Sequence, residues 1–210
     1  MQLPLRGLYA VTDDNLIPSA TLVDTVERAI VGGAQIVQYR SKSKDNVLRV
    51  EQARALRTLC QKYHVMFIVN DDISLAQMVN ADGVHLGMHD TLVSTARILL
   101  SDHFIIGVSC YNQLSLAQEA MDAGATYVAF GSFFQSPTKP NAVVADLGVL
   151  REARKKLTCP LVAIGGITPE NAQSLITAGA DCLAVIHGLF AQVNVTTAAQ
   201  RYARLFNSFN

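Results

Sequence analysis

Val65-Met66-Phe67-Ile68-Val69-Asn70-Asp71-Asp72 is an apolar run that passes directly into three residues with oxygen-bearing side chains. The run predicts a buried β-strand, and its polar end lies where a strand opens into a loop, the place where α/β enzymes carry their chemistry. The same order recurs along the chain, where Ile36-Val37-Gln38-Tyr39 leads into Arg40, Gly83-Val84-His85-Leu86 leads to Asp90, and Tyr127-Val128-Ala129-Phe130 leads to Lys139. Polar groups therefore gather at predicted strand ends.

Eight short apolar runs of this kind alternate with longer segments of helical period. This alternation is typical of βα units that feed a parallel sheet. The clearest helix is expected from Val47 to Tyr63, where apolar residues spaced by three and four lie opposite a polar face. Strands are expected at Leu8–Val11, Ile36–Tyr39, Met66–Val69, Val84–Leu86, Ile105–Val108, Tyr127–Phe130, Leu161–Ile164 and Leu183–Ile186.

A weak repeat precedes every second predicted strand, at 33–36, 80–83, 123–126 and 178–181. Each copy contains Gly or Asn, which can take a positive φ, and so predicts a helix end followed by a tight turn. Four βαβα units make eight strands, the number that closes a barrel around packed side chains. An open doubly wound sheet is the alternative, but no Gly-x-Gly-x-x-Gly follows the first strand. The sequence therefore predicts a single-domain (β/α)8 TIM barrel over residues 1–210.

The composition and charge of the chain argue against several classes of binding partner. The formal net charge is +0, so no overall field would attract nucleic acid or an anionic membrane, and every apolar run is shorter than the roughly 20 residues of a membrane span. Residues 1–6 lack a signal peptide pattern, which predicts a cytoplasmic protein. The four cysteines lack CxxC spacing, so neither a zinc site nor a disulfide framework is expected. A mean hydropathy of +0.25 is accounted for by a barrel interior or by a homo-oligomer interface.

Phosphate is the ligand most clearly indicated. Ile164-Gly165-Gly166-Ile167 ends the seventh predicted strand, and Thr168-Pro169-Glu170 is expected to open a helix with Thr168 as its N-cap. Glycines let backbone N–H groups approach an anion, and barrels commonly bind phosphate after strands seven and eight. A tight turn that simply requires glycine is the alternative explanation.

Cationic and acidic side chains also follow the strands. Arg40 and Lys42 flank Ser41, and Lys139 closes the segment 136–140; solvated surface bases are the alternative for each. Asp71 and Asp90 follow adjacent strands and are candidates to share a Mg²⁺ that bridges to a diphosphate. Helix N-capping is the competing role for Asp71 and Asp90, and it is especially indicated for Asp72 and Asp90. Together these groups suggest that a phosphorylated acceptor displaces diphosphate.

The sequence contains no convincing nucleophile triad. Cys110 lies at a strand end and could in principle pair with His85 or His187, but a buried inert thiol is the favoured interpretation. His85 is expected to be a hydrogen-bonded core imidazole. His187 ends the eighth predicted strand beside Gly188, which makes it a better candidate for contact with a ligand.

These residues together resemble thiamine-phosphate synthase along nearly the whole chain. The matching blocks are 8–13, Gln38-Tyr39-Arg40-Ser41-Lys42, Asn70-Asp71-Asp72, 81–87, Gly107-Val108-Ser109, Ser136-Pro137-Thr138-Lys139 and Ile164-Gly165-Gly166-Ile167. The resemblance implies a (β/α)8 barrel that joins hydroxymethylpyrimidine diphosphate to hydroxyethylthiazole phosphate and releases diphosphate with Mg²⁺ bound.

The resemblance also implies roles for individual positions. Asp71 and Asp90 would hold Mg²⁺. The implied catalytic residues are Arg40, Lys42, Asn70, Ser109 and Lys139. The implied contacts with the pyrimidine diphosphate are Gln38, Arg40, Lys42, Asn70, Ser109 and Lys139, together with Tyr39 and Ser41 from the same block, and those with the thiazole phosphate are Ser136, Pro137, Thr138, Gly166, Ile186 and His187.

The chain departs from the family pattern in three places. Ser41 stands where an acid is common, Met88-His89 precede Asp90 where Gln-Glu is familiar, and His187 occupies a position usually given to serine. Two alternatives to the synthase remain. One is a related thiazole tautomerase, which needs a histidine base and no diphosphate or metal site. The other is a non-catalytic regulatory barrel that binds a phosphorylated ligand.

Overall fold

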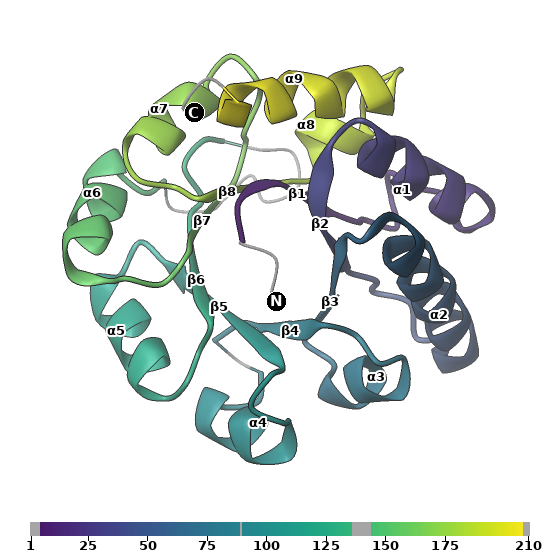
Figure 1. Cartoon of the computed structure of the whole chain (residues 1–210), viewed down its shortest axis with the longest axis horizontal. Helices are drawn as coiled ribbons and strands as arrows, with labels where there is room; N and C mark the ends of the chain where they lie inside the picture. Colours follow the sequence, from purple (N-terminus) through teal and green to yellow (C-terminus); the bar gives the residue numbers. More distant parts are fainter. Residues whose placement is uncertain (1–4, 89, 136–143, 208–210) are drawn as a thin grey trace.

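A computed structural model describes residues 5–88, 90–135 and 144–207 of the chain. Eight parallel strands close into a barrel in the order β1-β2-β3-β4-β5-β6-β7-β8, which confirms the predicted (β/α)8 fold (Figure 1). The strands are β1 Gly7–Val11, β2 Ala34–Tyr39, β3 Met66–Asn70, β4 Gly83–Leu86, β5 Ile105–Tyr111, β6 Tyr127–Phe130, β7 Leu161–Ile164 and β8 Cys182–Val185.

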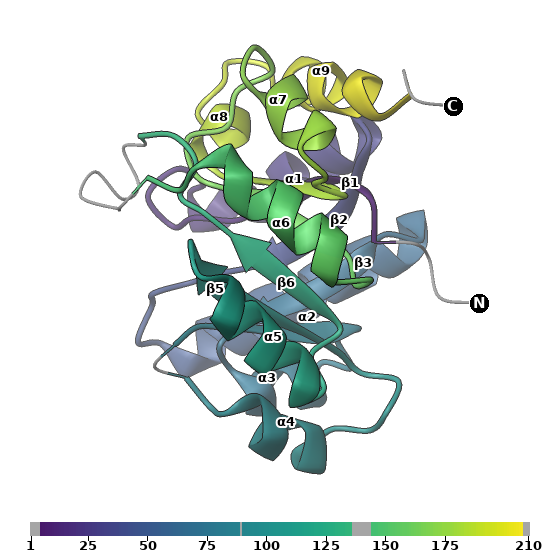
Figure 2. The same ribbon diagram turned by 90° about the vertical axis from the view of Figure 1, so that its left-hand side faces the viewer.

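Helices surround this barrel. Figure 2 shows α5 and α6 lying over the outside of the barrel at β5 and β6. The helices are α1 Leu22–Val31, α2 Asn46–Tyr63, α3 Ile73–Met78, α4 Val93–Leu99, α5 Leu114–Asp122, α6 Leu147–Lys156, α7 Ala172–Thr177, α8 His187–Phe190 and α9 Val195–Asn207, with a 3-10 turn η1 at Ser19–Thr21. None of the helices in the described ranges is long and apolar enough to cross a membrane.

Two apolar layers follow from the alternation of side chains along each strand. One layer fills the barrel interior and includes Tyr9, Ile68, Tyr127 and Val162. The other lies between the strands and the helices, where Val37, Tyr39 and other strand residues meet the apolar faces of the helices. The interior layer is therefore mostly packed, and part of it, with the carboxyl ends of the strands, is left to form a site.

The predicted turns are present at all four copies of the repeat. Gly33, Asn80, Gly124 and Gly179 each have a positive φ, between 51° and 115°. The predicted helix start at Thr168 is wrong, since α7 begins at Ala172. The reason is that the Asn171 side chain accepts from the Thr168 N–H at 2.9 Å and thus holds this segment as a turn.

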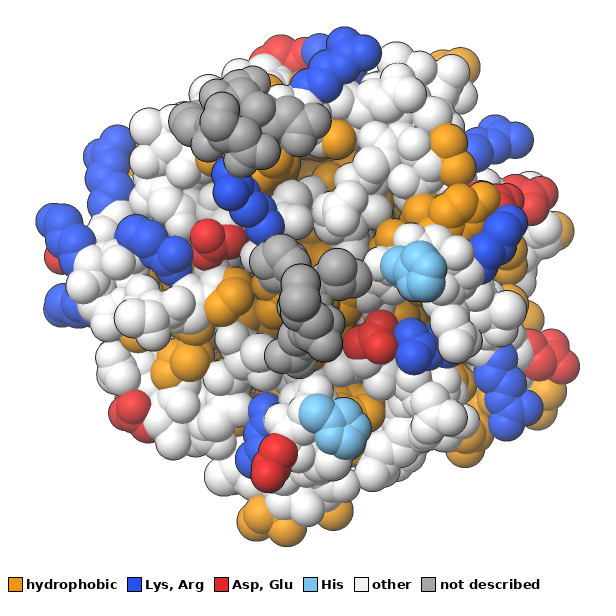
Figure 3. Space-filling view, in the orientation of Figure 1, with side chains coloured by type: hydrophobic (Ala, Val, Ile, Leu, Met, Phe, Trp, Pro, Cys, Tyr) orange, Lys and Arg blue, Asp and Glu red, His pale blue; other side chains and the backbone are white. Residues whose placement is uncertain are grey.

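The two ends of the barrel differ. Figure 3 shows the end at the amino termini of the strands, where acidic and basic side chains are interspersed. This face thus carries no field of a single sign, in keeping with the zero net charge. The cavity described below opens at the other end.

Candidate active site

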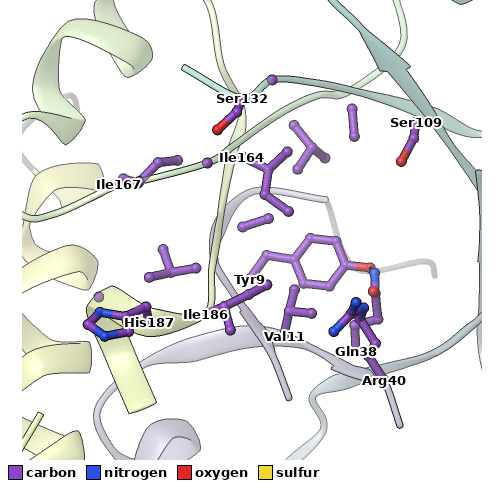
Figure 4. Close-up of a pocket in the computed structure, with 18 of the residues that line it drawn as sticks. Tyr9, Val11, Gln38, Arg40, Ser109, Ser132, Ile164, Ile167, Ile186 and His187 are labelled. Atoms are coloured by element: carbon purple, nitrogen blue, oxygen red, sulfur yellow. Dashed lines mark hydrogen bonds between the residues drawn. The ribbon is translucent and has the colours of Figure 1, made fainter. Parts of the chain in front are cut away.

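A cavity of about 550 Å³ opens at the carboxyl ends of the strands. Figure 4 shows that its lining comes from several strands, with the Tyr9 ring at its centre. The site residues predicted from the sequence that line this cavity are Gln38, Arg40, Asn70, Ser109, Gly166, Ile186 and His187. Side chains that are far apart in the sequence thus face one space, as the closed barrel predicts.

Three predicted contact residues lie away from this cavity. The Tyr39 side chain is buried between the barrel and the helices, and its hydroxyl donates to Gln52 Oε1 at 2.7 Å. The Ser41 hydroxyl and the Lys42 N–H both donate to Asp14 Oδ2, at 2.9 and 2.6 Å. An acid from the loop after β1, Asp14, therefore lies next to Ser41.

Four other predicted residues, Ser136, Pro137, Thr138 and Lys139, lie outside the described residues, as does His89. Their predicted roles stay predictions.

Asp71 and Asp90 are brought together beside the cavity. Burial, followed by hydrogen-bond contact with and repulsion by Asp90, raises the pKa of Asp71 to about 6, although Arg40 and Asn70 act in the opposite direction. Asp90 Oδ2 also accepts from the Gly87 N–H at 2.7 Å, and helix α4 begins only at Val93. Asp90 is therefore not the N-cap of α4, which was the alternative for it. Two crowded carboxylates suit a divalent cation.

Asp72, the neighbour of Asp71, has a structural role. Its side chain caps α3 by accepting from the Leu75 N–H at 2.9 Å. The same carboxylate pairs with Arg49 at 2.7 Å. Asp71, in contrast, has a φ of 61° and makes contact with Asp90. Asp72 therefore caps α3, whereas Asp71 forms the carboxylate pair with Asp90. Among the described residues, no group of three or more His, Cys, Asp or Glu could hold a metal ion.

Arg40 is held at the cavity edge by the loop after β1. Its guanidinium pairs with the buried Asp13 at 3.2 Å, and the backbone N–H of Arg40 donates to Thr12 Oγ1 at 2.8 Å. A guanidinium fixed in this way keeps further N–H donors for an anion.

The loop after β7 approaches the cavity with bare backbone. Gly165 and Gly166 have φ angles of 105° and 60°. A Cβ would meet Ser132 Oγ at 1.9 Å from Gly165 and the Gln135 carbonyl oxygen at 2.4 Å from Gly166, so neither position has room for a side chain. Within the described residues, the N–H groups of Gly166 and Ile167 donate to no protein acceptor.

The start of α8 lies opposite this loop and is similar to it. His187 and Gly188 line the cavity, and in the described part of the chain their N–H groups have no protein acceptor. Unpaired N–H groups after the seventh and eighth strands form the kind of anion site that barrels use for phosphate.

The remaining candidates behave as the sequence predicts. His85 is buried and hydrogen bonded through both ring nitrogens, to Tyr127 and to Ser109, each at 2.9 Å. Burial raises the pKa of the Cys110 thiol to about 12, so this cysteine is not a nucleophile.

Sequence reasoning missed several lining residues, among them Tyr9, Tyr111 and Gln192. Tyr9 lies inside an apolar strand, and the only signal for it was that it shares the inward alternation of β1 with Val11. Tyr111 follows an irregularity in the β5–β6 register and has a φ of 54°, which the sequence does not announce.

Comparison with known proteins identifies the same family that the sequence resembles. The profile of the family described as thiamine monophosphate synthase matches residues 8–189. A thiamine-phosphate synthase of Nitrosococcus oceani is 48% identical over 210 residues, which is 100% of this chain and 97% of that protein. One of Marinobacter nauticus is 53% identical over 184 residues, covering 88% and 82%.

Solved structures are similar as well. A thiamine phosphate pyrophosphorylase from Pyrococcus furiosus superimposes with a TM-score of 0.89 at 33% identity, covering 97% of this chain and 96% of that one. A geranylgeranylglyceryl phosphate synthase from Thermoplasma acidophilum, at 18% identity and a TM-score of 0.71, covers 99% of this chain and 100% of its own, and shares only the fold.

Proposed function

This chain belongs to the thiamine monophosphate synthase family, and we propose that it transfers the hydroxymethylpyrimidine group from its diphosphate to the ring nitrogen of hydroxyethylthiazole phosphate. It is a transferase, like the thiamine-phosphate synthases to which it is similar. One observation carries the assignment of its residues. A single cavity has Arg40 on one side, with the Asp71–Asp90 pair beside it, and on the other side backbone N–H groups that have no acceptor among the described residues, which provides for two phosphorylated substrates.

The pyrimidine diphosphate is assigned to the side of β2, β3 and β5. Arg40 is fixed by Asp13 and donates to diphosphate oxygens, and Asn70 lies next to the carboxylate pair. Lys42, exposed after β2 and not part of the cavity lining, and Lys139, outside the described residues, are assigned to the diphosphate from the resemblance alone. Gln38 and Ser109 border the deeper part of the cavity and bind the pyrimidine ring.

A divalent cation, which we propose to be Mg²⁺, fits Asp71 and Asp90. The fit rests on the contact between the two carboxylates, which together with burial raises the pKa of Asp71, because two crowded carboxylates are stabilised by a positive partner. Two carboxylates alone suit Mg²⁺, which usually keeps several waters and completes its shell with substrate phosphates. Bound there, the cation would neutralise charge on the diphosphate leaving group.

The thiazole phosphate is assigned to the side of β7 and β8. The N–H groups of Gly166 and Ile167 and those at the start of α8 donate to its phosphate oxygens. Ile186 packs against the thiazole, and His187 lies at the rim. Ser136, Pro137 and Thr138 are assigned to the same substrate from the resemblance alone.

The chemistry requires no strong base. The thiazole nitrogen already carries a lone pair, so the difficult step is the cleavage of the carbon–oxygen bond to diphosphate. The electron-rich aminopyrimidine stabilises the cation that this dissociative cleavage leaves, and the nitrogen lone pair then forms the new carbon–nitrogen bond. The chain's own contribution is to orient both substrates and to hold positive groups around the departing diphosphate. One missing donor in such a site costs about 10² to 10³ in rate.

The test is a stoichiometric assay with purified protein, Mg²⁺ and both substrates. Equal amounts of thiamine phosphate and diphosphate are expected, with neither formed when one substrate or the metal is omitted. Tight binding of both substrates without turnover would instead indicate a regulatory barrel. Isomerisation of a thiazole without metal would indicate a tautomerase, which has no use for Asp71 and Asp90.

Two further aspects belong to this proposal. We place the enzyme in the cytoplasm, supported by four cysteines that are all free and buried, as is usual in a reducing compartment. We also propose that it forms a homo-oligomer, supported by the exposed apolar side chains Leu92, Ile98 and Leu99. Light scattering at several concentrations tests the second point, and a strictly monomeric protein would contradict it.

A further inference from the structure

A chain of hydrogen bonds crosses the barrel interior, and four of its five side chains line the cavity. Gln38 Nε2 donates to the Tyr9 hydroxyl at 2.8 Å, and the Tyr9 and Tyr127 hydroxyls are 2.8 Å apart. The Tyr127 hydroxyl lies 2.9 Å from His85 Nδ1, and His85 Nε2 lies 2.9 Å from Ser109 Oγ. Four hydrogen bonds thus connect β2 to β5 through side chains on β1, β6 and β4.

The middle of this chain is rigid. Tyr9 and Tyr127 are 1% and 0% exposed, and the Tyr127 ring stacks on His85 with ring centroids 5.6 Å apart. A Cβ at Gly107 would lie 2.0 Å from Tyr127 Cζ, so the glycine makes the room that this ring occupies. The side chains therefore have little freedom to exchange partners.

Each phenol in the chain stays protonated. Burial raises the pKa of the Tyr9 and Tyr127 hydroxyls well above the ordinary value. Each therefore has one O–H to donate in addition to its lone pairs. A neutral imidazole likewise donates through one nitrogen and accepts through the other.

These capacities favour one direction for the whole chain. The Tyr9 hydroxyl accepts from Gln38 and so donates to Tyr127, and Tyr127 in turn donates to His85 Nδ1. The His85 proton then lies on Nε2 and is donated to Ser109 Oγ. If Tyr127 donated to Tyr9 instead, the Tyr9 hydrogen would lie between two donors, and an unsatisfied buried donor costs about 1–3 kcal/mol.

The direction matters at the two ends, which both line the cavity. Among the described residues, Gln38 Oε1 receives no hydrogen bond, so this oxygen remains an acceptor toward the cavity. The Ser109 hydroxyl accepts from His85 and keeps its own O–H for the cavity. The ends therefore present opposite polarity to a ligand, and Figure 4 shows Gln38 and Ser109 on the same side of the pocket.

We propose that Tyr9, Tyr127 and His85 are positioning residues that hold Gln38 as a hydrogen-bond acceptor and Ser109 as a donor toward the bound substrate. An aminopyrimidine suits this polarity, because its amino group donates to Gln38 Oε1 and a ring nitrogen or phosphate oxygen accepts from Ser109. The identity of the ligand rests on the proposed function. The polarity itself does not, since it is a property of the free protein.

The position of the His85 proton tests the proposal without any assay of activity. In ¹⁵N NMR at about pH 8, above the ordinary imidazole pKa of about 6.5, the free protein is expected to show His85 protonated on Nε2 only. The signal is assigned by its loss in His85→Asn. Protonation on Nδ1, or a mixture of the two forms, would overturn the assigned direction.

Gln38→Glu is the sharper variant. A carboxylate only accepts, so the chain must reverse and the His85 proton is expected to move to Nδ1. Tyr127→Phe breaks the chain in the middle, and in that background Gln38→Glu is expected to leave the His85 proton in place. No movement in the single variant, or equal movement in both backgrounds, would overturn the coupling.

Kinetics then connect the chain to the reaction. Tyr127→Phe is expected to raise the KM for the pyrimidine diphosphate about tenfold, the effect of one misoriented hydrogen bond, and to leave the KM for the thiazole phosphate within about twofold. Equal increases for both would overturn the positioning role, although the NMR result would stand. A protein with the expected NMR behaviour but no synthase activity would contradict the proposed function alone.

Discussion

Asp71 and Asp90 bring their carboxyl groups into contact beside the cavity, and burial together with this contact raises the pKa of Asp71 to about 6. We propose this pair as the cation site. A proton and a cation therefore compete for the same carboxylates. The competition makes the metal dependence of the protein sensitive to pH just below neutrality.

The first prediction concerns this competition. As pH falls below about 6, Asp71 gains a proton that Mg²⁺ must displace, so the apparent affinity for Mg²⁺ in the presence of diphosphate should fall about tenfold per pH unit. Titration calorimetry between about pH 5 and 7.5 measures this fall. An affinity that does not change over this range would contradict a role for Asp71 in metal binding.

The same pKa shift predicts how stability depends on pH without metal. The folded protein binds the Asp71 proton more tightly than the unfolded chain, whose ordinary aspartate pKa is about 3.9. The resulting stabilisation is present below about pH 4 and is lost as pH rises through about 6. Asp71→Asn should remove this part of the pH dependence, measured by thermal unfolding in a chelating buffer.

Neighbouring aspartates allow a matched comparison. Asp71→Asn should lower turnover by about 100-fold and raise the Mg²⁺ requirement without loss of stability, because Asp71 makes no helix cap. Asp72→Ala should instead cost about 1 kcal/mol of unfolding free energy, because it removes the α3 cap and the Arg49 pair, and should leave the Mg²⁺ dependence unchanged. Kinetics and chemical unfolding of both variants separate the roles. A reversed outcome would assign the metal to Asp72.

Tyr39 tests where a strand's side chains point. It lies between Gln38 and Arg40, both of which line the cavity, so alternation turns it outward to Gln52. Tyr39→Phe should cost about 1 kcal/mol of stability and leave both KM values unchanged, as measured by unfolding and by steady-state kinetics. A raised KM for the pyrimidine diphosphate would restore the substrate contact that the sequence resemblance implied.

The sequence could predict those parts of the fold and the site that have a local cause. The turns at Gly33, Asn80, Gly124 and Gly179 have a local cause, a residue that tolerates positive φ, and their spacing predicted eight strands. Gln38 and Ser109 were predicted as separate contacts. The connection between them was not, because it passes through side chains on three other strands that only the closed barrel brings together.

The start of α7 shows a different limit. Thr168-Pro169 satisfies the local rule for a helix start, but the Asn171 side chain accepts from Thr168 N and donates to the Gly166 carbonyl oxygen at 3.0 Å. Asn171 thus ties the turn to the glycine loop. Local preference was overridden by a contact that also shapes the predicted phosphate site.

Gly166 tests that site. Its φ of 60° and the 2.4 Å approach of a Cβ to the Gln135 carbonyl oxygen mean that Gly166→Ala must shift the loop. The KM for thiazole phosphate should rise at least tenfold, equal to the loss of about one charge-assisted hydrogen bond. Gly124→Ala is the control, because Gly124 has a φ of 98° and lies away from the cavity. It should lower stability with both KM values unchanged, and equal kinetic effects of the two variants would argue against the phosphate assignment.

His187 is the least regular member of the site, since it stands where serine is usual in the family that the chain resembles. It is exposed at the start of α8 and lines the cavity together with Gly166, so its ring is placed to donate to the thiazole phosphate. His187→Ala should raise the KM for thiazole phosphate about tenfold, the loss of one hydrogen bond to a charged group, and spare that for the pyrimidine diphosphate. His187→Ser should recover much of the loss, because a hydroxyl also donates. Steady-state kinetics with each substrate varied in turn measures both effects, and equal changes for the two substrates, or none, would leave His187 as a packing residue.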